Sequence, residues 1–167
     1  YVNDPVYSGS AGGFGGALLN GSVKDSEVTN LRKVNGTNYT GGFIGHLGKS
    51  GTVDLDKLGA LGDLLSAGAG VLDIFGSHVD KCRVSGVTEG FTVHSDNTID
   101  KKDKSEIAGG FTGYADLGRL SKNEVTRLKQ VTSGQIAGGF AGKTTFAYLA
   151  DIKLDSELVK ILVKALN

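Results

Sequence analysis

GGFGG at 12–16, GGFIG at 41–45, GGFTG at 109–113 and GGFAG at 138–142 are four copies of the motif Gly-Gly-Phe-x-Gly. The intervals between successive Phe residues are 29, 68 and 29 positions. Residues 11–45 align without a gap on residues 108–142, with 15 identities in 35 positions. A unit of about 29 residues therefore recurs, with copies that start near positions 11, 40, 108 and 137.

The long middle interval contains the same unit with two insertions. An apolar spacing of five and then three residues is shared by three triplets: Val23, Val28 and Leu31; Val79, Val84 and Val87; and Leu120, Val125 and Leu128. The first insertion, about 54–76, has apolar residues at helical spacing but is interrupted by glycines at 59, 62, 68 and 70, which predicts a broken helix. The second, about 93–104, predicts a loop. The tail at 155–166 predicts an amphipathic helix that caps the open end of the repeat array.

The conformation of the repeat itself is decided by the copy that contains the two insertions. Residues 121–124 match a capping box and favour a helix, whereas residues 79–93 are rich in β-branched residues and are interrupted by Gly86 and Gly90. Related units should share one conformation, so we expect strands. A 29-residue unit cannot bury a core alone, and stacking on its neighbours as a parallel β-solenoid solves this problem. We expect glycines at turns with positive φ and at close backbone approaches, and a buried ladder of the four Phe side chains.

Composition limits the class of protein. The chain has 167 residues, 18 basic and 18 acidic side chains, one Cys and no Met. Zero net charge argues against a binder of nucleic acid or anionic membranes, and one Cys excludes a disulfide framework. The length predicts a single domain, and the missing initiator Met indicates a piece of a longer protein with flanking domains. No segment has the pattern of a signal peptide or a membrane span.

The blocks alternate with short segments of the type Ser-x-Val-x-x-x-x-Val, as in residues 77–84. This arrangement resembles the glycine-rich, GLUG-like repeats of large surface proteins and adhesins of Gram-positive bacteria, over nearly all of residues 6–148. The resemblance implies a right-handed β-helix in an exported, cell-wall-anchored protein. It brings no catalytic residues and no cofactor.

Candidate chemistry is sparse. Residues 137–144 nearly match a phosphate-binding loop, but the other three blocks lack its Lys, so the glycines are better explained by the repeat. The second insertion offers the oxygen ligands Asp96, Asn97, Asp100 and Asp103 as weak candidates for ligand binding. Interspersed lysines and a missing turn glycine argue against a calcium site there. We therefore expect a solvated loop that is suited to partner contacts.

The three histidines and the cysteine add no convincing site. His46, His78 and His94 have no partner at metal-ligand spacing, and Cys82 replaces Ser26 and Asn123 of the other copies at a small inward or turn position. The sequence thus predicts a protein without metal or cofactor and without catalytic activity. We expect it to act in adhesion or ligand binding at the bacterial cell surface. The partner would be a host or neighbouring-cell glycan or matrix protein. A structural stalk and a carbohydrate-active β-helix enzyme remain alternatives.

Overall fold

The computed structural model describes residues 9–48, 76–97, 105–116 and 118–145. These residues form seventeen β-strands and no helix, and every strand pairing among them is parallel. The strands fall into three layers of five and a fourth layer of two. Successive layers follow the repeat of the sequence, so the prediction of an all-β fold with stacked parallel strands is confirmed.

Within each layer the strands follow one another in chain order. Layer 1 contains β1 (Ser10–Gly12), β2 (Gly15–Leu19), β3 (Ser22–Lys24), β4 (Glu27–Leu31) and β5 (Lys33–Gly36). Layer 2 contains β6 (Tyr39–Gly41), β7 (Ile44–Gly48), β8 (Ser77–Asp80), β9 (Arg83–Gly86) and β10 (Phe91–Ser95). Layer 3 contains β11 (Ile107–Gly109), β12 (Thr112–Asp116), β13 (Gly118–Ser121), β14 (Glu124–Thr126) and β15 (Leu128–Ser133). Layer 4 contains β16 (Ile136–Gly138) and β17 (Ala141–Thr145).

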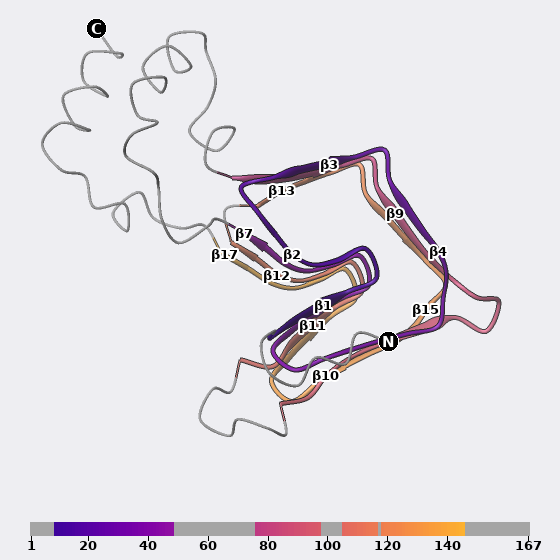
Figure 1. The fold of residues 1–167 in the computed structure, drawn as a ribbon. Coiled ribbons are helices and arrows are strands. Elements are labelled where there is room, and N and C mark those ends of the chain that lie inside the picture. Colours follow the sequence, from indigo (N-terminus) through magenta and orange to yellow (C-terminus); the bar gives the residue numbers. More distant parts are fainter. Residues whose placement is uncertain (1–8, 49–75, 98–104, 117, 146–167) are drawn as a thin grey trace, which may run out of the picture.

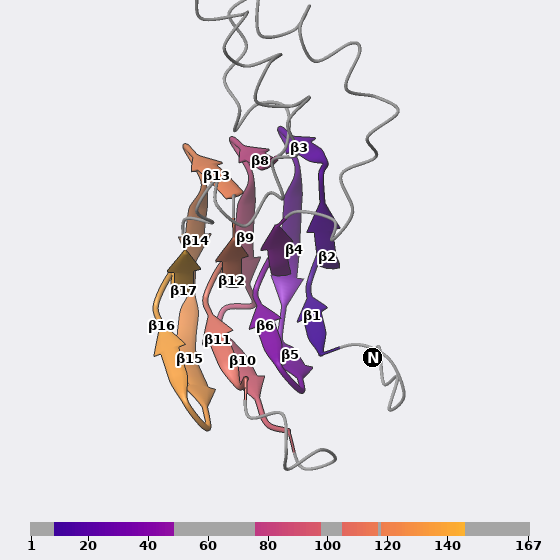
Figure 2. The same cartoon turned by 90° about the vertical axis from the view of Figure 1, so that its left-hand side faces the viewer.

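Strands at the same place in successive layers pair into five sheets. Sheet A is β1-β6-β11-β16, sheet B is β2-β7-β12-β17, sheet C is β3-β8-β13, sheet D is β4-β9-β14 and sheet E is β5-β10-β15. Viewed along the stack, strands of one sheet nearly superpose, and sheets A and B run side by side, joined by the Gly-Gly-Phe turn (Figure 1). The side view shows the layers in sequence order, from β1 to β17 (Figure 2).

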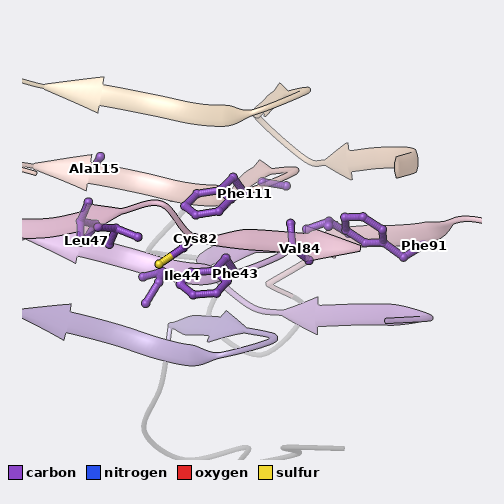
Figure 3. Close-up of a cluster of buried hydrophobic side chains, with 11 residues drawn as sticks. Phe43, Ile44, Leu47, Cys82, Val84, Phe91, Phe111 and Ala115 are labelled. Carbon is purple, nitrogen blue, oxygen red and sulfur yellow. The ribbon is translucent and has the colours of Figure 1, made fainter. Parts of the chain in front are cut away.

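The predicted ladder of phenylalanines is present. The rings of Phe43 and Phe111 are completely buried and stack with their centroids 4.9 Å apart (Figure 3). Phe14 stacks on Phe43 at 4.8 Å and Phe140 on Phe111 at 5.0 Å. These two outer rings are 49% and 37% exposed because they belong to the end layers. The ladder is therefore a buried column with two open ends.

The prediction that Val87 takes the place of Leu31 in layer 2 is wrong. Phe91 pairs with Leu128 in sheet E and is completely buried, and its ring lies against Gly42 of the Gly-Gly-Phe turn. Val87 is only half-buried and starts a turn that is closed by the N–H of Gly90, which donates to the Val87 carbonyl at 2.9 Å. This turn lies before the predicted second insertion at about 93–104 and accounts for part of the extra length of layer 2, which spacing alone did not reveal.

The glycines mainly serve close approach. A Cβ on Gly45 would lie 2.6 Å from the carbonyl oxygen of Ala11, so the third glycine of the block lets sheet B approach sheet A. Among the described glycines only Gly90 has a positive φ, 86°. The expectation that glycines supply the positive-φ corners is therefore wrong for the repeat itself. Those corners are occupied by other residues: Asn20, Asp25, Asn30, Lys81, Lys122 and Arg127.

The insertions lie mostly outside the described residues. The predicted helix at 54–76 falls there except for Gly76, and it interrupts the chain between β7 and β8. The predicted capping helix at 155–166 is also outside the described residues. Residues 93–95, assigned from sequence to the start of the second insertion, are the end of strand β10 and pair with both neighbouring layers.

Candidate functional site: an aromatic cluster between sheets A and B

Three aromatic side chains meet on sheets A and B, apart from the phenylalanine ladder. Tyr39 comes from β6, His46 from β7 and Tyr114 from β12, and we call these three residues the aromatic cluster. The ring centroid of Tyr39 lies 5.2 Å from that of His46 and 5.0 Å from that of Tyr114. His46 and Tyr114 are register partners, and their rings stack at 5.2 Å. All three side chains are half-buried, so the cluster lies at the surface.

Glycines of the repeat create this meeting of two sheets. A Cβ on Gly113 would lie 2.5 Å from the backbone nitrogen of Thr40, as close an approach as that of Gly45 to β1. Because these positions have no side chain, the backbones of sheets A and B come close together. Tyr39 on sheet A therefore reaches the rings carried by sheet B.

The neighbours of the cluster along the stack differ in size. In layer 1 the register partners of Tyr39 and His46 are Ser10 and Ala17, both small. On the opposite side, Lys143 of layer 4 places its Nζ 5.7 Å from the centroid of the Tyr114 ring, a cation–π contact. The cluster is thus covered by a cation at one end and bordered by small side chains at the other.

Polar groups adjoin Tyr114. Its hydroxyl lies 2.8 Å from Thr145 Oγ1, and either oxygen can donate. The Thr145 hydroxyl also lies 3.4 Å from Asp116 Oδ1, to which it donates. A surface with half-exposed rings beside hydroxyl and carboxylate groups offers both apolar contact and directed hydrogen bonds.

His46 is the titratable member of the cluster. Burial lowers the pKa of its imidazole, and the nearby carboxylate of Asp116 opposes this effect by raising it. Its Nε2 is buried and has no hydrogen-bond partner within the described part of the chain. The ring is therefore neutral at pH 7, and the cluster presents an uncharged aromatic surface.

The candidate ligands Asp96 and Asn97 lie beside the passage from sheet E to sheet A. The Asp96 N–H donates to the Gly36 carbonyl at 3.0 Å, and its carboxylate is 3.8 Å from Nε2 of His94. Asn97 donates from its side chain to Asn38 Oδ1 at 2.9 Å and from its N–H to Glu106 Oε1 at 3.1 Å. These contacts fasten the segment to the end of layer 1, to the corner that follows it, and to the residue that precedes β11 of layer 3.

The other two candidates, Asp100 and Asp103, lie outside the described residues. Within residues 9–48, 76–97, 105–116 and 118–145 there is no group of three His, Cys, Asp or Glu side chains able to hold a metal ion. The near-match to a phosphate-binding loop at 137–144 forms the turn from β16 to strand β17, whereas such a loop leads into a helix.

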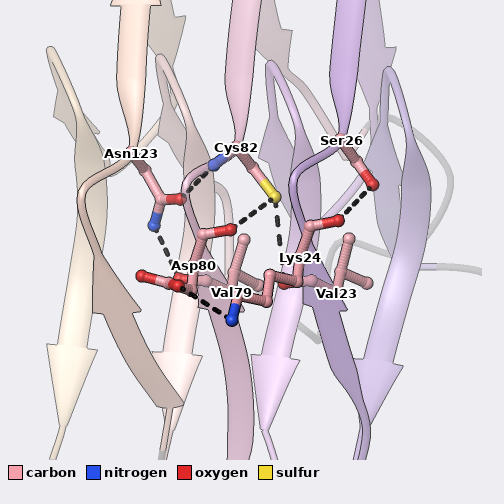
Figure 4. Close-up of polar contacts among 7 residues, drawn as sticks. All are labelled: Val23, Lys24, Ser26, Val79, Asp80, Cys82 and Asn123. Atoms are coloured by element: carbon pink, nitrogen blue, oxygen red, sulfur yellow. Dashed lines mark hydrogen bonds and ion pairs between the residues drawn. The ribbon is translucent and has the colours of Figure 1, made fainter.

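Cys82 has a structural environment. It is buried and occupies the same corner as Ser26 of layer 1 and Asn123 of layer 3, as expected (Figure 4). Its Sγ lies 3.3 Å from the Asp80 carbonyl, and its N–H donates to Asn123 Oδ1 at 2.8 Å. Burial raises the pKa of the thiol, with smaller opposing contributions from backbone hydrogen bonds. A protonated, buried thiol is a poor nucleophile.

The sequence contains a signal for the aromatic cluster that the search for catalytic and metal motifs missed. His46 and Tyr114 each follow the Phe of their block by three positions, where the other copies have Ala17 and Lys143. The contribution of Tyr39 to the aromatic cluster has no such signal in the sequence, because it depends on the close approach of sheet A to sheet B.

Comparison with known proteins gives no further guide. Family models, curated proteins and solved structures were all searched, and none of them matches this chain. In the part of the chain that the structure describes, no helix has the length and apolar character needed to cross a membrane.

Proposed function

We propose that the chain is a right-handed parallel β-helix module of a bacterial cell-surface protein, and that it binds a ligand through the aromatic cluster without catalysis. The observation that carries this proposal is the group of half-buried rings of Tyr39, His46 and Tyr114 on a rigid stack of strands. Two features support the architecture: the parallel pairing of strands in successive layers and the resemblance to glycine-rich surface repeats.

The chemistry of the cluster favours a glycan as the ligand. The C–H face of a sugar ring packs well on an aromatic ring, and sugar hydroxyls need donors and acceptors at the rim. The Tyr114 hydroxyl and the carboxylate of Asp116 are such groups. Layer 1 leaves room for a sugar beside the rings because its side chains at the register positions, Ser10 and Ala17, are small.

A purely structural stalk is the second candidate, and it is favoured by the exterior of sheet D. Here Arg83 lies between two carboxylates of the adjacent layers, 3.8 Å from Glu27 and 2.9 Å from Glu124. Such a row of ion pairs is a solvated face that suits a spacer. The aromatic cluster departs from this pattern, which is why binding is preferred.

The experiment is a screen of the purified chain on an array of glycans and matrix proteins, followed by titration of the strongest hit. Tyr39→Ala and Tyr114→Ala should each weaken binding by about tenfold or more, because each removes a ring face. His94→Ala is the matched control, since His94 is a half-buried aromatic residue on sheet E. Equal binding by all three variants would reject the cluster as the site. If the folded protein binds nothing on the array, the structural stalk is favoured.

A further inference from the structure

The two ends of the stack carry complementary halves of one contact, which the chain makes three times internally. In each internal contact, the Phe carbonyl of one layer accepts N–H groups from the Phe of the preceding layer and from the residue after it. The Phe43 carbonyl accepts from the N–H groups of Phe14 (2.9 Å) and Gly15 (3.2 Å). The Phe111 carbonyl accepts from those of Phe43 (2.8 Å) and Ile44 (3.1 Å). The Phe140 carbonyl accepts from those of Phe111 (2.8 Å) and Thr112 (3.1 Å).

The two end layers carry the same backbone groups. In layer 4 the N–H groups have no described acceptor, and in layer 1 the Phe carbonyl has no described donor. Strands β16 and β17 are the last strands of sheets A and B, so no described strand lies beyond the N–H groups of Phe140 and Ala141. Strands β1 and β2 are the first, and no described strand precedes the carbonyl of Phe14. Figure 2 shows these two pairs of strands at opposite ends of the stack. One end thus offers two donors and the other the matching acceptor.

The surroundings of Gly139 differ from those of the second glycine in the three preceding blocks. The second glycine of each preceding block sits under the backbone of the next layer: a Cβ on Gly13 would lie 2.5 Å from the Gly42 carbonyl oxygen, and Cβ atoms on Gly42 and Gly110 would collide with the carbonyls of Gly110 and Gly139. A Cβ on Gly139 would meet nothing within 4 Å. A further Gly-Gly-Phe turn stacked on layer 4 would require a glycine at this position, as in the three preceding blocks.

The ring ladder leads to the same conclusion. Phe14 and Phe140 are the most exposed rings of the ladder, at 49% and 37%, and each lacks a partner ring on its outer face among the described residues. Large exposed apolar side chains beside unpaired strand edges favour association with further strands. A ring stacked on each outer face would extend the spacing of 4.8 to 5.0 Å found inside the stack.

We propose that the layer-4 turn binds the layer-1 turn of a second copy of this chain, so that copies associate head to tail. The Phe140 and Ala141 N–H groups donate to the Phe14 carbonyl of the second copy, and the two Phe rings stack. A second copy is favoured over an unrelated partner because the same chain carries both halves of the contact, in the register of its internal layers. The contact is heterologous, so association does not stop at a dimer.

The first test is sedimentation velocity of the full 167-residue chain over a wide range of concentration. The proposal predicts a weight-average sedimentation coefficient that rises with concentration. Gly139→Ala should reduce association by about tenfold or more, because its Cβ fits the single chain but collides with a stacked carbonyl. Gly15→Ala is the matched control: a Cβ there meets only Ile44 Cδ1 at 3.7 Å and the Ala17 carbonyl oxygen at 4.0 Å, and the equivalent positions of the other layers carry side chains.

A mixing experiment tests the direction of the contact. Phe14→Glu blocks the layer-1 end by placing a carboxylate against Phe140, whereas Gly139→Ala blocks the layer-4 end. Each variant alone should remain monomeric, and an equimolar mixture should form dimers and nothing larger, because each partner keeps one intact end. Far-ultraviolet circular dichroism and the urea midpoint establish that both variants are folded.

A wild-type chain that stays monomeric at every concentration overturns the proposal. Association that Gly139→Ala leaves unchanged also overturns it, because the contact then lies elsewhere on the surface. A mixture of the two folded variants that yields no dimer rejects the head-to-tail arrangement. None of these outcomes depends on ligand binding by the aromatic cluster, so the two proposals fail separately.

Discussion

Replacement of Phe43 by alanine tests the architecture most directly. The Phe43 ring is completely buried and is stacked between Phe14 at 4.8 Å and Phe111 at 4.9 Å. Loss of a buried Phe side chain costs about 3–5 kcal/mol through lost apolar transfer and the cavity left behind. Phe43 has ring partners on both faces, so we expect a value near the upper end, about 4–5 kcal/mol.

The assay is equilibrium unfolding in urea, with the midpoint and the slope recorded for each variant. Phe140→Ala is the control from the same ladder, because that ring is 37% exposed and has one described stacking partner. We expect it to lose about 1–2 kcal/mol. The comparison is made at a concentration where the chain is monomeric, since association would stabilise Phe140. If Phe43→Ala costs less than about 1 kcal/mol, or no more than Phe140→Ala, the ladder is not a buried column and the stacking of layers is refuted.

Two further predictions concern a glycine and a histidine. Gly110→Ala should destabilise the fold by about 2–3 kcal/mol or more in urea unfolding, because its Cβ would collide with the Gly139 carbonyl, whereas Gly139→Ala should change stability by less than about 0.5 kcal/mol. Equal effects would contradict the layer geometry. Because the pKa of His46 is lowered from 6.5, the unfolded chain binds a proton that the folded chain does not, and stability should fall as the pH drops below about 6.5. His46→Gln should reduce that fall in urea midpoints measured between about pH 7.5 and 5, and an unchanged profile would contradict the burial of the imidazole.

The sequence predicted the parts of the fold that every copy repeats. The register pairs Val23 with Val79 and Val79 with Leu120, as the shared apolar spacing indicated. The same approach failed for Val87, because the second copy, layer 2, contains a short turn before Phe91 that shifts the alignment by a few residues. An aromatic ring then fills the place of a leucine, and only the three-dimensional register reveals the exchange.

The turn chemistry was less predictable. The corners with positive φ carry residues such as Asp25, Lys81 and Lys122, which occupy one corner in successive layers. Gly was expected there because it adopts this conformation without steric cost. The second part of the expectation is confirmed, because the glycines lie where backbones of adjacent layers and sheets nearly touch. Which backbone each glycine meets depends on long-range packing, so the sequence could not specify it.

The candidate site shows how a repeated unit builds a surface that occurs once. The Phe side chains of the blocks form the ring ladder, and glycines such as Gly45 and Gly113 leave no space for a Cβ. The position three residues after the Phe points outward and is free to change, from Ala17 in layer 1 to His46 in layer 2. Aromatic residues in two adjacent layers place their rings 5.2 Å apart because the layer spacing is set by the backbone. Changes at outward positions can thus create an aromatic surface across two adjacent layers, at little cost to the fold that supports it.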